Sequence, residues 1–121
     1  MPHFMLLLHE NPNAYSNFTP EQMEKLIEKY QQWSARVAGE NKLLGGHKLA
    51  DEGGKRMQKG ARLEVKDGAF GEAKEVIGGY YLIAADSYED AVRLCHEHPH
   101  LLPGNTIEIR RVDPMVHPES A

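Results

Sequence analysis

Residues Asp67 to Tyr81 read DGAFGEAKEVIGGYY, and this stretch decides the fold prediction for the chain. It opens with an Asp-Gly pair that is typical of a turn, and a short charged run follows. Two glycines then lead into aromatic and aliphatic residues, so that the pattern predicts a strand over residues 76–85. The two glycines indicate a bulge or a close approach of strands.

Upstream of this stretch, the sequence predicts a strand, a helix, a second strand and a hairpin. His3–Leu8 is almost wholly apolar and is typical of a central strand, with a loop over 9–16. Leu43–Leu49 indicates a strand that carries two glycines. Residues 56–58 and 61–66 then predict a hairpin around Lys59-Gly60.

The first helix, Thr19 to Gly39, has the clearest signals. Thr19 and Gln22 fit a capping box, and Pro20 occupies the first helical position. Apolar residues recur at helical spacing and are expected to cover one face of a sheet: Met23, Leu26, Ile27, Tyr30, Trp33 and Val37.

A second helix and a final strand follow the central stretch. Ser87 is the predicted N-cap, and the helix must stop by His98 because Pro99 follows. Its expected core residues are Tyr88, Ala91, Val92 and Cys95. Residues 106–112 alternate apolar and polar side chains, which predicts a half-buried strand.

This order of elements predicts an α+β domain with the ferredoxin-like βαββαβ arrangement, enlarged by a hairpin insert. Both helices would cover one face of a four-stranded antiparallel sheet. The other face would carry Glu108, Arg110 and alternate apolar residues of the first strand. A bare apolar face favours a homodimer packed through its sheets. Residues 1–112 form the domain, and residues 113–121 a loose tail.

Composition narrows the class of protein. The 121 residues are 40% hydrophobic and 26% charged, with a net charge of −4, as in one globular domain. Scattered cations and this net charge argue against a nucleic-acid partner. No apolar run is long enough to span a membrane, the N-terminus lacks signal-peptide features, and Cys95 is the lone cysteine. We therefore expect a cytoplasmic protein.

Four segments together resemble the YCII-related family, in particular its DGPF subgroup. They are FMLLLHE near the N-terminus, the Leu44-Gly45-Gly46 triplet, DGAFGEAKEVIGGYYLI, and the closing TIEIRRV. The resemblance covers about residues 3 to 112. It implies a dimeric α/β barrel similar to muconolactone isomerases and small cofactor-free monooxygenases. Most members of the subgroup have no assigned activity, and some occur beside extracytoplasmic-function sigma factors.

The chain departs from the family pattern at two places. Ala69 stands where the subgroup motif has proline, so that turn is less rigid. The wider family has a His–Asp pair proposed as an active site, but the first helix here contains no histidine. We therefore do not transfer that pair to this chain.

Three residues are the candidates for acid–base catalysis: His47, Glu72 and Lys74. Glu72 could act as a base while Lys74 stabilises an oxyanion, and the intrinsic pKa of a histidine such as His47 suits acid–base work. The alternative is structural, since loop carboxylates are usually solvated and a lone histidine usually has a hydrogen-bonding role.

Candidate ligand-binding residues lie on the central stretch and the last strand: Asp67, Phe70, Glu75, Tyr80, Tyr81, Glu108 and Arg110. Tyr80 and Tyr81 point to opposite sheet faces, so one packs under a helix and the other faces the barrel. Glu108 and Arg110 share a face and could bind a polar ligand or form an ion pair between subunits. Asp67 could equally cap its own turn, and Phe70 could be a core residue.

The sequence favours neither a metal nor a cofactor. His96, His98 and His100 are spaced unsuitably for a helical metal site, and Pro99 interrupts them. Cys95 lies on an apolar helical stripe and is expected in the core. Gly78-Gly79 belongs to no phosphate-binding motif.

Two functions remain open at this stage. The first is a small cofactor-independent enzyme acting on an organic acid, a lactone or a polar aromatic. The second is a non-catalytic dimer that binds a metabolite or a protein. A pocket of several hundred cubic ångströms with converging polar groups would favour the enzyme.

Overall fold

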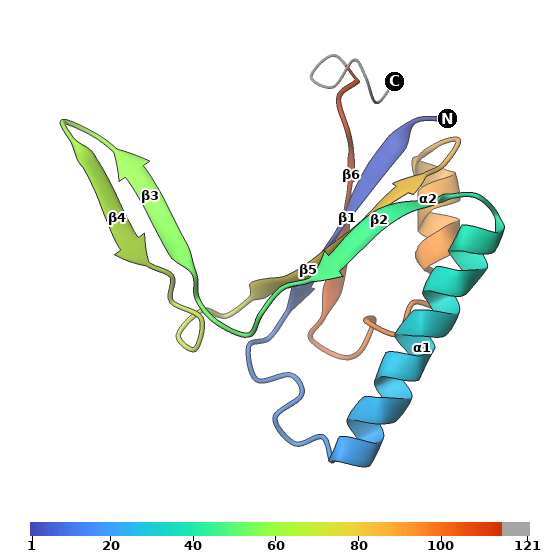
Figure 1. Ribbon diagram of the computed structural model, residues 1–121, viewed down its shortest axis with the longest axis horizontal. Helices are drawn as coiled ribbons and strands as arrows, with labels where there is room; N and C mark the ends of the chain where they lie inside the picture. Colours follow the sequence, from blue (N-terminus) through green and yellow to red (C-terminus); the bar gives the residue numbers. More distant parts are fainter. Residues whose placement is uncertain (115–121) are drawn as a thin grey trace.

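The computed structural model describes residues 1–114 and consists of a four-stranded sheet, two helices and a separate hairpin (Figure 1). In chain order, the elements are β1 (His3–Glu10), α1 (Pro20–Gly39), β2 (Leu43–Lys48), β3 (Lys55–Lys59), β4 (Leu63–Asp67), β5 (Val76–Ala84), α2 (Tyr88–Cys95) and β6 (Thr106–Arg111). The predicted loose tail lies almost wholly outside the described residues. No helix within residues 1–114 is long and apolar enough to cross a membrane.

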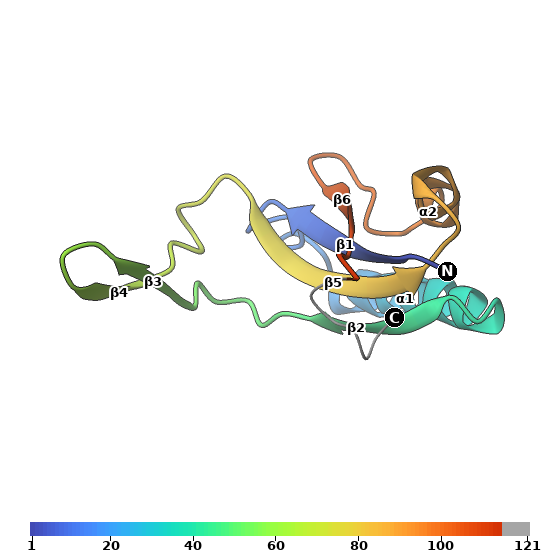
Figure 2. The same ribbon diagram turned by 90° about the horizontal axis from the view of Figure 1, so that it is seen from above.

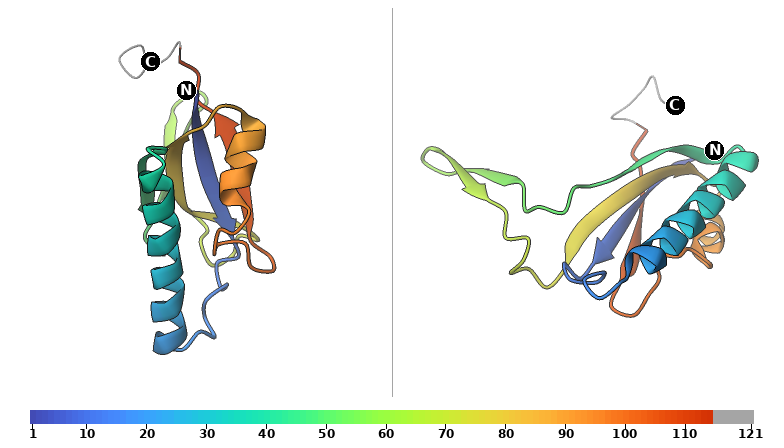
Figure 3. Two further views of the ribbon diagram at one scale, coloured as in Figure 1. Left: turned by 90° about the vertical axis from the view of Figure 1, so that its right-hand side faces the viewer. Right: turned by 60° about the horizontal axis from the view of Figure 1, so that its bottom comes forward.

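The main sheet has the strand order β2-β5-β1-β6, and each neighbouring pair is antiparallel. The α1 connection runs between β1 and β2 with β5 inserted between them. The α2 connection likewise joins β5 to β6 across β1. This is the ferredoxin-like split βαβ arrangement. The α+β, ferredoxin-like part of the fold prediction is confirmed, and the dimeric barrel stays a prediction. Figure 3 shows both helices on one face of the sheet.

The hydrophobic core lies between this face and the two helices. Phe4 and Leu6 of β1 are at most 1% exposed, and their partners Ile83 and Tyr81 on β5 point to the same side. Ile107 and Ile109 of β6 complete the apolar layer. The opposite face of the sheet carries the alternate residues and is called the open face below.

The start and the packing of α1 follow the sequence prediction. Thr19 Oγ1 accepts from the Gln22 amide at 3.1 Å, and Gln22 Oε1 accepts from the Thr19 amide at 2.8 Å. These bonds are the predicted capping box. Trp33 is buried, and its Nε1 donates to the Leu94 carbonyl at 2.8 Å, joining the two helices. Ile27, by contrast, is 49% exposed because α1 is separated from the sheet by a cavity at this end.

The core face of α2 differs from the predicted one. Leu94 is buried along with Ala91 and Cys95, whereas Val92 is 45% exposed and Tyr88 is 47% exposed. The i, i+3, i+4 set that starts at Ala91 excludes position 92 from the buried stripe. Tyr88 still packs edge-on against Phe4, with ring centroids 4.9 Å apart. Burial raises the thiol pKa of Cys95 to about 11, in agreement with the predicted core role.

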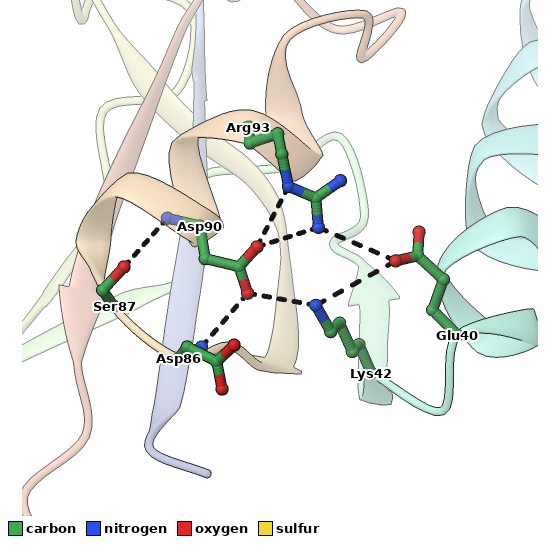
Figure 4. Close-up of polar contacts among 6 residues, drawn as sticks. All are labelled: Glu40, Lys42, Asp86, Ser87, Asp90 and Arg93. Atoms are coloured by element: carbon green, nitrogen blue, oxygen red, sulfur yellow. Dashed lines mark hydrogen bonds and ion pairs between the residues drawn. The ribbon is translucent and has the colours of Figure 1, made fainter.

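A charged cluster fastens the end of α1 and the start of β2 to α2 (Figure 4). Asp90 accepts from Lys42 Nζ at 3.0 Å, from Arg93 at 2.8 and 3.0 Å, and from the Asp86 amide at 3.1 Å. The Asp86 amide and the two cations lower the Asp90 carboxyl pKa to about 2. Because all its members have partners here, the cluster is a structural clamp.

The β3–β4 hairpin stands away from the body of the molecule in Figures 1 and 2, and it is called the arm below. A Cβ on Gly53 would lie 2.3 Å from the Gly68 carbonyl oxygen. The segments before β3 and after β4 can therefore pass this closely at the base only with glycine. The Gly68 amide donates to the Gly54 carbonyl at 2.9 Å. Asp67-Gly68 therefore forms the base of the arm. The predicted turn lies later, with bonds from the amides of 72 and 73 to the Ala69 carbonyl.

Two smaller boundaries also differ from prediction. Strand β1 continues through His9 and Glu10, which were expected in a loop. Helix α1 ends at Gly39 as expected, but the residue with positive φ is Asn41, at 60°. An asparagine tolerates this left-handed conformation better than most residues do.

Candidate active site in a cavity under the first helix

A cavity of about 410 Å³ is lined by α1 and by the adjoining ends of β1, β2 and β5. Its apolar wall includes Leu8 from the sheet and Met23, Leu26 and Ile27 from the helix. Polar side chains also line it, among them Glu10, Lys48, Asp51, Tyr15 and Tyr30. The volume lies in the range of small-molecule sites, and the mixture of apolar walls with few polar groups is typical of them.

The glycines of the central stretch create space for this cavity. A Cβ on Gly78 would lie 1.6 Å from Glu10 Oε1, so the Glu10 carboxyl fills the position that any side chain at 78 would take. A Cβ on Gly79 would lie 2.9 Å from the His47 carbonyl oxygen of the neighbouring strand. Pairing between β1 and β5 shifts register at this point. The predicted bulge and close strand approach at Gly78-Gly79 are both confirmed.

Glu10 lines the cavity, and its surroundings shift its pKa in the direction that favours proton transfer near neutral pH. Burial raises the pKa of its carboxyl, the nearby Lys48 cation partly opposes that change, and Asp51 adds to it. Lys48 Nζ is itself bonded to Asp51 Oδ1 at 3.0 Å, on an exposed part of the rim. Glu10 can thus hold a proton at a higher pH than an ordinary glutamate does.

A chain of hydrogen bonds lies beside the cavity. His100 Nε2 donates to the His9 carbonyl at 2.8 Å. Burial lowers the His100 pKa, which favours a neutral ring, so its Nδ1 can accept from Tyr30 Oη at 3.3 Å. Tyr15 Oη in turn accepts from Asn105 Nδ2 at 3.2 Å. Burial raises the phenol pKa of both tyrosines, which therefore remain protonated donors.

Behind this chain, His98 lies among aromatic rings. Its ring centroid is 4.5 Å from Trp33, 5.2 Å from Tyr30 and 5.4 Å from Tyr81. Its Nδ1 accepts from the His100 amide at 3.0 Å, and burial lowers its pKa to about 3. His98 and His100 are thus neutral core residues. Within residues 1–114, no group of three or more His, Cys, Asp or Glu side chains is arranged to hold a metal.

The open face carries a second polar group, centred on His9. The Nδ1 of His9 lies 2.8 Å from Glu75, and its Nε2 lies 2.8 Å from Glu108. Arg110 contacts Glu108 at 3.5 Å. Bonding to His9 and then to Arg110 lowers the Glu108 pKa. Each ring nitrogen of His9 therefore has a carboxylate partner, so the groups at this position already satisfy one another.

The predicted residues Tyr80 and His47 also meet at the open face. His47 and Tyr80 are cross-strand partners, and His47 Nδ1 lies 2.9 Å from Tyr80 Oη. Tyr81 points the other way and packs against Trp33, with centroids 4.7 Å apart. The two tyrosines therefore face opposite sides, as predicted. Atoms of all three predicted residues border the cavity.

The remaining predicted residues are not brought together. Glu72 and Lys74 are exposed on the loop before β5, and neither has an ion-pair partner within the described chain. Asp67 pairs with Lys55 on the arm, and Phe70 is partly buried in the turn. The structure therefore groups Glu75, Glu108 and Arg110, and separately His47 with Tyr80. It leaves Glu72 and Lys74 apart from both groups.

Sequence reasoning missed Glu10, Tyr15 and Tyr30 as site residues. The sequence pattern predicts a loop at Glu10, whereas β1 includes this residue and places its carboxyl over Gly78. Helical spacing predicts Tyr30 only as part of the apolar stripe of α1. One signal was available: a charged residue closing an apolar strand, with a Gly-Gly pair on a later strand, is compatible with a carboxyl that needs space.

The fold and the cavity define an α+β protein with ferredoxin-like topology and a small-molecule-sized pocket under its first helix. The family model of the YCII-related domain matches residues 2–116, nearly the full length of the chain. The chain belongs to the YCII-related family. A search of curated proteins found no match.

Proposed function

We propose that this chain is a cofactor-independent enzyme that acts on a small organic molecule in the cavity under α1, with Glu10 as the general acid–base. The observation that carries the proposal is a carboxyl of raised pKa inside an apolar-walled cavity of about 410 Å³. A carboxyl that titrates closer to neutrality can both take and return a proton at working pH.

The cavity also indicates a class of substrate. Leucine, methionine and isoleucine walls suit a ring or a short hydrocarbon chain, and Tyr15, Tyr30 and Tyr81 add aromatic surface. Lys48 lies close enough to influence Glu10 and could balance a carboxylate or a developing oxyanion. Lactones, phenols and small aromatic or aliphatic acids combine these features.

The residue roles follow from protonation. Glu10 would remove a proton next to a carbonyl group or return one to the resulting anion. The tyrosines stay protonated and could orient the substrate through hydrogen bonds. His47 remains a candidate at the border of the cavity, where it contacts Tyr80. Glu72 and Lys74 remain candidates only if the loop before β5 moves toward a bound ligand.

We further propose membership of the DGPF subgroup and a homodimer packed through the open faces to form an α/β barrel. Met5, Leu7 and Leu82 lie on this face between the polar groups. Their partial exposure supports an interface. Leu7→Glu should then give a monomer in sedimentation velocity at micromolar concentration. Dimerisation of Leu7→Glu at wild-type strength would exclude this interface.

The direct test of the cavity is a thermal-shift screen with small acids, lactones and phenols, followed by mass spectrometry for turnover. Wild type should be stabilised by at least one compound. That effect should be lost in Glu10→Gln and in Ile27→Trp, which fills the cavity. Glu24→Gln, an exposed glutamate of α1 outside the cavity lining, is the matched control and should retain binding. Binding unchanged in Glu10→Gln and in Ile27→Trp would place the site elsewhere.

A non-catalytic binding dimer is the second candidate function. The mutual pairing of His9, Glu75, Glu108 and Arg110 favours it, because satisfied ion pairs suit an interface better than a reaction centre. Mass spectrometry separates the two functions. In one outcome, a ligand binds in the cavity and yet is recovered chemically unchanged with every class of co-substrate tested. That result would support the non-catalytic binding function.

A further inference from the structure

The arm exposes an apolar stripe that the rest of the described chain does not cover. The strands β3 and β4 pair only with each other, and all ten of their residues are exposed. Met57 pairs with Val65, and Lys59 pairs with Leu63, so three apolar side chains share one face. Met57 is 67% exposed, Val65 57% and Leu63 54%.

A hairpin of this kind needs a partner surface. Two strands without a covered face are marginally stable in water. The base of the arm is nevertheless well defined. Gly53 and Gly68 let the two segments that lead into and out of the arm pass closely, and the Gly68 amide donates to the Gly54 carbonyl. A specific base with an uncovered apolar face is typical of an element that packs against another molecule.

The direction of the arm indicates where that molecule sits. Figures 1 and 3 show the arm projecting to the side of the sheet opposite the two helices. This is the side of the open face. A molecule seated on the open face would therefore be flanked by the arm.

Charge indicates what the partner is. Residues 55–67 contain five Lys or Arg and two Asp or Glu, a net charge of +3. The other residues contain nine Lys or Arg and 16 Asp or Glu, a net charge of −7. A basic arm on an acidic body is complementary to a second copy of the same chain.

We propose that the arm of each subunit clasps a second copy of this chain, with the face formed by Met57, Leu63 and Val65 buried against the partner. The inference rests on the proposed homodimer and adds a second contact to it. In a two-fold symmetric dimer both arms make the same contact, so that the arm of each subunit packs against the other subunit. The arm would then add apolar area and charge attraction to the sheet-to-sheet interface.

The first experiment measures the dimer dissociation constant by sedimentation equilibrium. We expect Met57→Gln/Val65→Gln to weaken the dimer at least tenfold. These side chains contact no core residue, so the variant should fold, which circular dichroism would verify. Val92→Gln/Leu101→Gln is the matched control, because it also replaces two half-exposed apolar residues, outside the arm. It should stay within twofold of wild type. Wild-type affinity in the arm variant would overturn the proposal.

The second experiment locates the tip of the arm. A photo-crosslinking residue replaces Ala61, and ¹⁵N-labelled chains are mixed with unlabelled chains before illumination. Crosslinked peptides that combine both isotopes are expected. Same-isotope peptides alone would show that the arm stays on its own chain and overturn the proposal.

The outcomes separate this inference from the proposed function. A dimer lost in Leu7→Glu but unaffected by the arm variant would overturn the clasp and keep the open-face interface. A monomeric wild type would overturn both, leaving the arm for another partner. Ligand binding in the cavity is measured independently through Glu10→Gln.

Discussion

The two faces of the four-stranded sheet use alternate residues of the same strands but differ in how they treat ionisable groups. On the open face, His9 contacts Glu75 and Glu108, and Arg110 contacts Glu108. On the helix-covered side, Glu10 enters a cavity where burial is the largest influence on its pKa. The ionisable groups on the open face satisfy one another, whereas the largest influence on Glu10 is its burial.

This difference shows that desolvation, more than the number of charged residues, marks a candidate site. A solvent-exposed ion pair adds little free energy to folding, and its paired groups are poorly suited to act as an acid or a base. A half-buried carboxyl with few partners has a shifted pKa and stored electrostatic cost. The central stretch contributes to both faces: Glu75 to the open one, and Gly78 to the space for Glu10.

The largest expected difference between the faces concerns packing. Trp33→Ala should lower the free energy of unfolding by about 3–5 kcal/mol, because it removes a buried ring and the bond to Leu94. Tyr80→Ala, on the open face, should cost at most about 1 kcal/mol in the monomer. Urea denaturation at low protein concentration measures both. Equal losses would mean that the open face also contributes to the core of the single chain.

The second prediction removes the space for Glu10. In Gly78→Ala, the new Cβ would lie 1.6 Å from Glu10 Oε1 and must displace the carboxyl toward solvent. We expect a stability loss of about 1–2 kcal/mol from this rearrangement. The pKa of Glu10, followed by carboxyl NMR, should fall toward 4.5, its value without the protein environment.

Gly71→Ala is the matched control for this change, because a Cβ there meets nothing within 4 Å. It should leave the Glu10 pKa where it is in wild type. A Glu10 pKa that is equal in wild type and Gly78→Ala would contradict the role of Gly78.

The third prediction compares an ion-paired carboxylate on each side. Asp90→Asn should lower stability by about 1 kcal/mol after solvent screening is allowed for. The Asp90 pKa falls from 3.8 to about 2 on folding, so its contribution is complete above pH 3.8 and disappears as the pH drops through 2. Asp90→Asn should therefore flatten the acid part of the stability profile. Glu108→Gln on the open face should leave monomer stability unchanged. A larger effect of Glu108 than of Asp90 would reverse the comparison.

The fold was predictable because local signals and the global arrangement agree. The capping box at Thr19, the apolar run of β1 and the alternation in β6 each require their element, and the order of elements leaves the ferredoxin-like arrangement. Errors occurred at Ile27 and Val92, where helical spacing does not reveal whether a neighbouring element is present to bury the side chain.

The site was less predictable, because it depends on contacts between distant residues. Charge density directed attention to Glu72 and Lys74, which are exposed in a loop. Glu10 looked like a loop residue after an apolar run, and only the pairing of β1 with β5 brings it over Gly78. The Gly78-Gly79 pair predicts a close approach, but Glu10, which fills the space at Gly78, is 68 positions away and does not follow from sequence spacing.

The smallest predicted effect has the opposite sign from the others. Glu10→Gln should raise the free energy of unfolding at pH 7 by about 0.5 kcal/mol, because it removes a partly desolvated charge while keeping the shape of the side chain. Folding raises the Glu10 pKa, so in wild type the unfolded state releases its proton first, and stability falls as the pH rises from 4.5 through the folded pKa. The variant lacks this fall, and its advantage should vanish below pH 4.5.

Thermal denaturation of both proteins between pH 4 and 8 tests this, with Glu72→Gln as an exposed control whose difference from wild type should not change. The opposite result would be a stability of Glu10→Gln, relative to wild type, that is lower at pH 7 than at pH 4. It would mean that the ionised Glu10 carboxylate stabilises the fold and is not a destabilised functional group.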